Sequence, residues 1–104
     1  MGYSQKEIHA KKTEIETYIN WAEYFHINKN YQKVIEYFYK AQDSISLEDR
    51  RIFANALKNS NKLLEASIIL DPLVQSNYAK VYDYYQYISL IPKNKKLVKE
   101  YIEK

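Results

Sequence analysis

The chain of 104 residues has no cysteine, one glycine and two prolines. Without cysteine it can form no disulfide, no thiolate zinc site and no thiol nucleophile, which fits a reducing compartment such as the cytoplasm. A single glycine argues against a β fold with many tight turns and against glycine-rich phosphate-binding loops. No apolar run approaches the ~20 residues that a membrane helix needs.

The sequence also lacks the side-chain groupings that carry out catalysis. His9 and His26 lie seventeen residues apart with no spaced ligand between them, so we expect no metal site. Paired acids such as Glu14 and Glu16 are read as exposed charges or helix caps. No phosphate-loop, dinucleotide or nucleophile-elbow motif is present. We therefore predict a protein that is not an enzyme, with no catalytic, cofactor-binding or metal-binding residues.

What the chain does contain is helical periodicity, clearest in the stretch from Tyr31 to Ser46. Its apolar and small residues follow the spacing that places them on one face of an α-helix. They are Tyr31, Val34, Ile35, Phe38, Ala41 and Ile45.

A weaker copy of this pattern returns 32 residues later. Seven pairs agree in character at that offset: Trp21 and Phe53, Ala22 and Ala54, Phe25 and Leu57, Tyr31 and Leu63, Val34 and Ala66, Phe38 and Leu70, Ala41 and Leu73. A single helical hairpin cannot bury its apolar face, whereas stacked hairpins can. The period therefore predicts a stack of helical hairpins.

These residues resemble the tetratricopeptide repeat (TPR), a helix-turn-helix unit of roughly 34 residues. The sequence departs from that pattern where Ala22 replaces its glycine, Val34 its alanine and Ser46 its proline, and another α-solenoid family stays an alternative. The resemblance implies an all-α fold, an α-solenoid of about three antiparallel hairpins in a right-handed superhelix. We place the hairpins at about 5–45, 46–70 and 73–103, in a single domain over 1–104, and one interpretation is that this domain is excised from a larger protein.

Local signals set the expected helix limits. Asn28 to Asn30 and Asn59 to Asn61 are predicted turns, because asparagine tolerates the left-handed conformation. Ser46 is a predicted N-cap, and Asp71 and Pro72 are expected either to end the fourth helix or to begin a new helix with Asp71 as its cap. The expected helices are Gln5–Ile27, Tyr31–Ser44, Leu47–Lys58, Lys62–Leu70, one from Leu73 or Asn77 to Leu90, and Lys95–Glu103 after a turn at Pro92 to Asn94.

Twelve tyrosines against three phenylalanines are the unusual feature of the composition. One interpretation is that their rings cover partly exposed helix faces with the hydroxyl in water. The other is a concave binding groove, suggested by the spacing of Tyr78, Tyr82 and Tyr85. Because the first helix of each hairpin lines the inner surface of TPR domains, the resemblance adds further candidates. The full groove set is Tyr18, Asn55, Lys58, Tyr78, Tyr82, Tyr85 and Gln86.

The net charge is +3, and lysines gather at the carboxy-terminal end. A solvated last helix explains them; the alternative is an anion-binding set, Lys93, Lys95, Lys96 and Lys99. The leading hypothesis is a bacterial protein-interaction or scaffold module that binds a peptide, a helix or another copy of itself. The alternative is an accessory oligomerisation or acceptor-positioning domain of a larger bacterial glycosyltransferase or polymer-synthesising enzyme. A third, less favoured, is binding of nucleic acid or another anionic polymer through the lysines.

Overall fold

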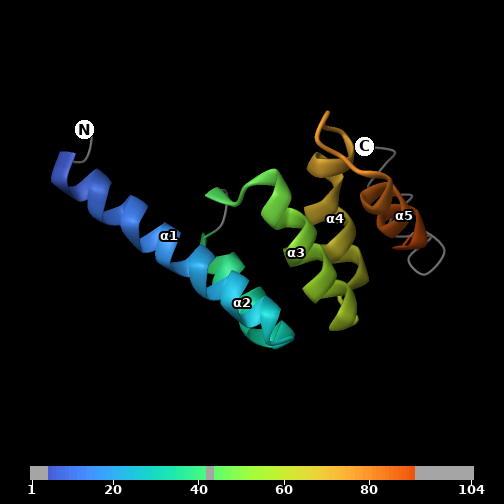
Figure 1. Cartoon of the computed structure of the whole chain (residues 1–104), viewed down its shortest axis with the longest axis horizontal. Coiled ribbons are helices and arrows are strands. Elements are labelled where there is room, and N and C mark those ends of the chain that lie inside the picture. The colour runs from blue at the N-terminus through green and yellow to red at the C-terminus, as the bar shows by residue number, and fades with distance from the viewer. Residues whose placement is uncertain (1–4, 42–43, 91–104) are drawn as a thin grey trace. The chain divides into compact units, whose positions relative to one another are not determined.

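The computed structural model describes residues 5–41 and 44–90, without the side chains of residues 6–10. This part of the chain is all-helical and contains no strand (Figure 1). The chain packs as two compact units, Met1–Ile45 and Ser46–Lys104. The single domain over 1–104 stays a prediction. None of the described helices is both long and apolar enough to cross a membrane.

The first unit is a hairpin of two helices, α1 (Gln5–Ile27) and α2 (Tyr31–Ala41). The predicted apolar stripe of α2 is confirmed, since Val34 and Phe38 are fully buried and Ile35 and Ala41 nearly so. On α1, Ala22 is also fully buried. At 23 residues α1 is about twice as long as the 11-residue α2, so α2 can cover only about half of its length.

The second unit contains three helices, α3 (Leu47–Asn59), α4 (Leu63–Val74) and α5 (Val81–Leu90). α4 packs against both α3 and α5. The predicted cap of α3 is confirmed, because the Ser46 hydroxyl accepts the Asp49 N–H at 3.1 Å. Between α3 and α4, the Arg50 guanidinium donates to the Ile69 carbonyl at 3.0 Å.

The turns of the α1–α2 and α3–α4 hairpins have the same backbone geometry. Lys29 and Asn61, 32 residues apart, both adopt a left-handed conformation, with φ of 57° and 60°. The next N–H in each turn donates five residues back, from Asn30 to Phe25 at 2.9 Å and from Lys62 to Leu57 at 2.8 Å. This bond satisfies a carbonyl that the helix end would otherwise leave without a partner. The expectation that asparagine occupies the left-handed position is correct for the second turn and wrong for the first.

The same offset relates the buried residues of the two hairpins. The pairs in which both members are buried are Ala22 and Ala54, Val34 and Ala66, Phe38 and Leu70, and Ala41 and Leu73. The two hairpins therefore bury equivalent positions around equivalent turns.

The prediction that Pro72 ends the fourth helix is wrong, because α4 continues to Val74. Proline lacks the N–H that would donate to the Ile68 carbonyl, at a cost of about 3 kcal/mol in a helix interior. The two residues after it, Leu73 and Val74, are 0% and 8% exposed. Their burial contributes about 1.5–3 kcal/mol each, enough to offset the lost bond.

The later helix limits also differ from those expected. α5 begins at Val81 instead of Leu73 or Asn77, whereas the expected continuation of α2 from Ala41 to Ser44 crosses residues 42–43, which lie outside the described residues. Ser76 accounts for the intervening turn, because its hydroxyl donates to the Leu73 carbonyl and accepts the Tyr78 N–H. The predicted turn at 92–94 and helix at 95–103 lie outside the described residues.

Lys29→Gly should stabilise the chain by about 0.5–1 kcal/mol. A left-handed conformation costs an L-residue about 1–2 kcal/mol and glycine nothing comparable, although glycine loses more chain entropy on folding. Lys33→Gly, at an exposed position inside α2, is the matched control and should destabilise by about 1 kcal/mol. Urea unfolding of both variants measures the difference, and equal losses of stability would contradict the role of Lys29.

Candidate functional site: a hollow between α3 and α5

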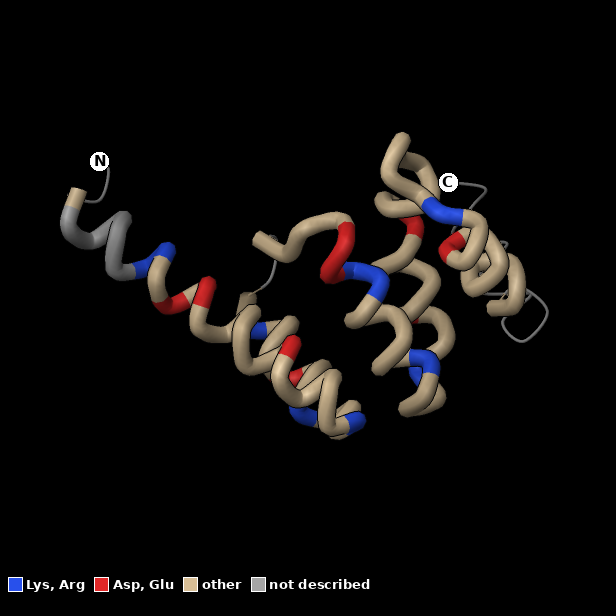
Figure 2. The backbone as a smooth tube through the Cα atoms, in the orientation of Figure 1, with Lys and Arg blue, Asp and Glu red and all other residues tan. Residues whose placement is uncertain are grey.

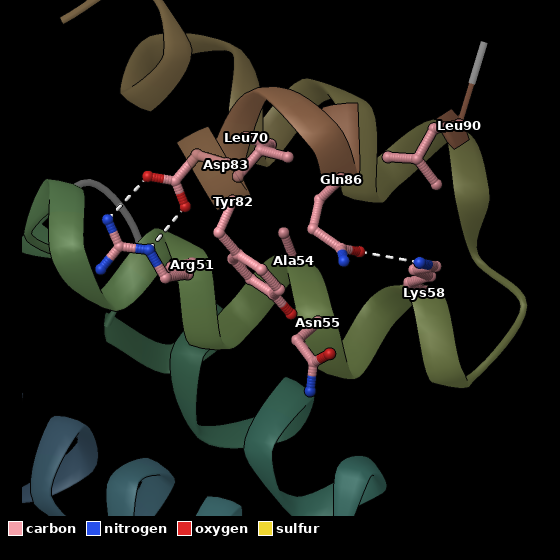
Figure 3. A pocket seen from close by; sticks show the side chains of 9 residues that line it. All are labelled: Arg51, Ala54, Asn55, Lys58, Leu70, Tyr82, Asp83, Gln86 and Leu90. Atoms are coloured by element: carbon pink, nitrogen blue, oxygen red, sulfur yellow. Dashed lines mark hydrogen bonds and ion pairs between the residues drawn. The ribbon is translucent and has the colours of Figure 1, made fainter. Parts of the chain in front are cut away.

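A small hollow in the second unit lies between α3 and α5, with α4 beneath (Figure 3). Its enclosed volume is only about 10 Å³, about the space that one water molecule needs. The hollow can therefore receive a side chain or chain segment at its surface, but it cannot enclose a small substrate. Its lining comprises Arg51, Ala54, Asn55 and Lys58 of α3, Leu70 of α4, and Tyr82, Asp83, Gln86 and Leu90 of α5.

The lining is apolar at its base and polar around its edge. Ala54, Leu70 and Leu90 are 5%, 2% and 1% exposed and belong to the packed interior of the chain. Tyr82, by contrast, is 52% exposed, so its ring offers apolar surface to a partner while its hydroxyl stays near water.

An ion pair between Arg51 and Asp83 closes one end of the hollow (Figure 3). Arg51 Nε donates to Asp83 Oδ1 at 2.5 Å, and Arg51 Nη2 donates to Asp83 Oδ2 at 2.7 Å. The Asp83 side chain is fully buried, whereas the Arg51 side chain is 23% exposed. This paired geometry is the strong form of a carboxylate–guanidinium contact, and it joins α3 to α5 directly.

Asp83 also fixes the beginning of α5. Its Oδ2 accepts the backbone N–H of Lys80 at 2.8 Å, which is the contact that a third-position acid makes with the N-cap residue in a capping box. One carboxylate therefore starts α5 and attaches it to α3. Tyr82 and Gln86, one residue before and three after Asp83, are placed at the hollow as a result.

These contacts set the protonation of the pair. The Arg51 hydrogen bonds hold the pKa of Asp83 below its usual value, against the opposing effect of burial, and the Lys80 N–H lowers it further. Asp83 in turn raises the pKa of Arg51. Both groups are charged at neutral pH.

At the other end of the hollow, Lys58 Nζ donates to Gln86 Oε1 at 2.7 Å (Figure 3). This amide is neutral, and the one carboxylate in the lining, Asp83, is already bound to Arg51. The hollow therefore presents a lysine charge whose partner within it is uncharged. Nearby, the Asn55 side-chain oxygen accepts from Asn59 at 3.3 Å.

Four of the predicted groove residues meet at this hollow: Asn55, Lys58, Tyr82 and Gln86. Tyr78 and Tyr85 do not line it. Tyr78 precedes α5, so the three tyrosines do not form one helical line, and Tyr85 is 74% exposed on α5. Tyr18 belongs to the first unit. The anion-binding candidates Lys93, Lys95, Lys96 and Lys99 lie outside the described residues.

Sequence reasoning missed the ion pair that shapes the hollow. Arg51 and Asp83 are 32 residues apart, the offset already seen in the apolar repeat. An acid within the otherwise uncharged run from Val81 to Leu90 was the available signal, because a lone charge on an apolar helix needs a partner.

Tyr18 instead borders an open hollow of the first unit, of about 470 Å³, with Lys11, Glu14, Ile15 and Lys40. Its hydroxyl donates to Glu14 Oε1 at 2.7 Å, and this bond raises the pKa of Tyr18. Lys40 Nζ lies 5.6 and 5.4 Å from the ring centres of Tyr18 and Tyr37. Tyr37 stacks on Phe25 at 5.8 Å with an 8° angle between the rings. These contacts join α1 to α2.

Comparison with known proteins adds no relationship: no protein-family model, curated protein or solved structure matches the chain. Within the part of the chain that the structure describes, no group of three or more histidines and acids is placed to hold a metal ion.

Asp83→Asn should cost on the order of 3 kcal/mol at neutral pH, because it leaves a largely buried guanidinium without its counter-ion. The pKa of Asp83 is lower in the folded chain than in the unfolded chain. Its contribution to the free energy of unfolding is therefore fully present above the unfolded pKa of about 3.9 and is lost as the pH falls through the folded pKa. Urea unfolding of the parent chain and of Asp83→Asn, from pH 7 downward, should show the difference between their free energies of unfolding closing below about pH 4. A difference in the free energy of unfolding that does not change with pH would contradict the ion pair.

Proposed function

We propose that the chain is a non-catalytic interaction module that holds a peptide segment or helix of a partner protein at the hollow between α3 and α5. The observation that supports this most is the convergence of Asn55, Lys58, Tyr82 and Gln86 beside a buried ion pair. Three of these side chains carry amide or ammonium donors, and the fourth carries an exposed ring.

The site suits a peptide because it combines three kinds of contact. The Tyr82 ring can pack against an apolar side chain, while the Asn55 and Gln86 amides can exchange hydrogen bonds with peptide groups. Lys58 adds a charge that favours acceptor groups on the partner. Since the Arg51–Asp83 pair orders this surface in advance, less entropy is lost when a flexible partner binds.

The proposal includes the arrangement expected from the sequence, a TPR-like α-solenoid of hairpins in a right-handed superhelix. It is supported by the equivalent turns at Lys29 and Asn61 and by the buried pairs at the same offset. In such a stack α3 and α5 are the first helices of successive hairpins, and the Arg51–Asp83 pair spans them. The third hairpin, at about 73–103, would begin its first helix at Val81.

The other functions considered from the sequence stay predictions. They are the accessory domain of a larger bacterial enzyme and the lysine-dependent binding of an anionic polymer. The hollow has an uncharged, apolar floor and exposed aromatic and amide groups. This combination favours a peptide over either of these two alternatives. The cytoplasmic location and the absence of enzymatic activity are likewise predictions.

A displayed library of random peptides, selected against the full chain, tests the proposal. The best peptides should lose at least tenfold in affinity on Lys58→Met and on Tyr82→Ala, because these substitutions remove the charge and the ring of the hollow. Titration calorimetry with one synthetic peptide gives the dissociation constants.

Two exposed residues away from the hollow serve as matched controls. Tyr84 is on the same helix as Tyr82 and similarly exposed, at 47%, and Lys33 is an exposed lysine of α2. Tyr84→Ala and Lys33→Met should leave the affinity within twofold. A library that enriches no peptide, or peptides that ignore the hollow variants, would refute the proposal.

A further inference from the structure

The side of α5 turned away from the hollow carries a second surface of a different kind. Its large side chains are apolar or aromatic and strongly exposed: Val81 81%, Tyr84 47%, Tyr85 74% and Ile88 61%, with Tyr78 just before the helix at 69%. Large exposed apolar patches mark interaction surfaces.

Helix geometry separates this surface from the packed side. With 3.6 residues per turn, the exposed residues of α5 fall within an arc of about 160°. The residues that contact the rest of the unit, Asp83, Tyr87 and Leu90, fall on the opposite side. Tyr82 lies at the edge of the arc beside the hollow and belongs to the proposed peptide site, so it is not counted in this surface.

The exposed side also carries no charge. After Asp83, whose carboxylate is buried, α5 contains no further acid or base (Figure 2). The nearest charge is Lys80, exposed between Tyr78 and Val81 at the edge of the surface, so a partner meets no charge along the helix itself. An apolar, self-complementary partner is favoured by such a surface.

We propose that this surface of α5 pairs with the same surface of a second copy of the chain. In an antiparallel two-fold arrangement, Val81 of each copy meets Ile88 of the other, and Tyr84 and Tyr85 lie next to the axis. The apolar residues are placed symmetrically about the Tyr84–Tyr85 pair, which is what an isologous contact requires.

The area is sufficient for a stable pair. Without Tyr82, the three other tyrosines are between 47% and 74% exposed, and at ~200 Å² per side chain they offer roughly 400 Å² in each copy. Two copies then bury roughly 800 Å², and Val81 and Ile88 bring the total to about the 1,000 Å² that a specific interface needs. The contact uses described residues only and leaves Asn55, Lys58 and Gln86 open.

Sedimentation of the full chain over a range from micromolar to near-millimolar concentration tests this pairing. We expect a monomer–dimer equilibrium whose dissociation constant rises at least tenfold in Ile88→Lys. Ile68→Lys is the matched control, because Ile68 is an exposed isoleucine of α4, at 41%, and it should leave the dissociation constant within twofold.

The absence of cysteine allows a second, geometric readout. Tyr85→Cys, next to the axis, should give a disulfide-linked dimer under mild oxidation, whereas Tyr24→Cys on α1 should give several-fold less. A monomer at every concentration, or a dimer that Ile88→Lys does not weaken, would overturn the pairing and indicate that another segment or another protein covers α5.

The same variants separate this inference from the proposed peptide site. Lys58→Met should abolish peptide binding without changing the dimer, and Ile88→Lys should do the reverse. A negative result for one surface can therefore be distinguished from a negative result for the other.

Discussion

A carboxylate without contact with water cannot stay charged in a folded protein unless other groups replace its hydration. Asp83 meets this condition through two bonds from Arg51 and one from the Lys80 backbone. The second unit depends on this one group, because it determines where α5 starts, which helix it is joined to and which of its sides is buried. The two surfaces of α5 follow from that orientation. Tyr82 and Gln86 reach the hollow, and Val81, Tyr85 and Ile88 remain outside.

The α1–α2 and α3–α4 hairpins are built without glycine at their turns. The chain has one glycine, so the left-handed positions that such turns need are occupied by Lys29 and Asn61. The cost of the left-handed conformation at Lys29 and Asn61 is tolerated because each turn satisfies helix-end carbonyls and is followed by a helix with a well-buried stripe. Val34 and Phe38 in α2, and Ala66 and Leu70 in α4, anchor those stripes.

The sequence was informative where periodicity and local hydrogen bonding act alone. The apolar stripe of α2, the Ser46 cap and the 32-residue correspondence of buried positions could all be predicted from spacing. Prediction failed where tertiary contacts override a local rule. Pro72 was expected to end a helix, but burial of Leu73 and Val74 carries α4 past it. The start of α5 depends on Asp83, whose partner Arg51 is remote in the chain.

The candidate site was predictable in part for the same reason. Asn55, Lys58, Tyr82 and Gln86 lie on α3 and α5, two helices that the TPR resemblance assigned to an inner surface, and they share the hollow. Tyr78 was misplaced because it was assigned to a helix that begins three residues later. Arg51 was missed because neither of the adjacent arginines of α3, Arg50 and Arg51, gives a sign of its partner until α3 and α5 are placed side by side.

The most direct test of the central claim is a double-mutant cycle on the ion pair, using Arg51→Met, Asp83→Leu and the combined variant. Each single substitution should lower the free energy of unfolding by about 3–5 kcal/mol, since each leaves a buried charge unpaired. The combined variant should lose at least ~1.5 kcal/mol less than the sum of the two. Additivity within about 0.5 kcal/mol would show that Arg51 and Asp83 do not act together, and the role given to them in ordering α5 would be wrong.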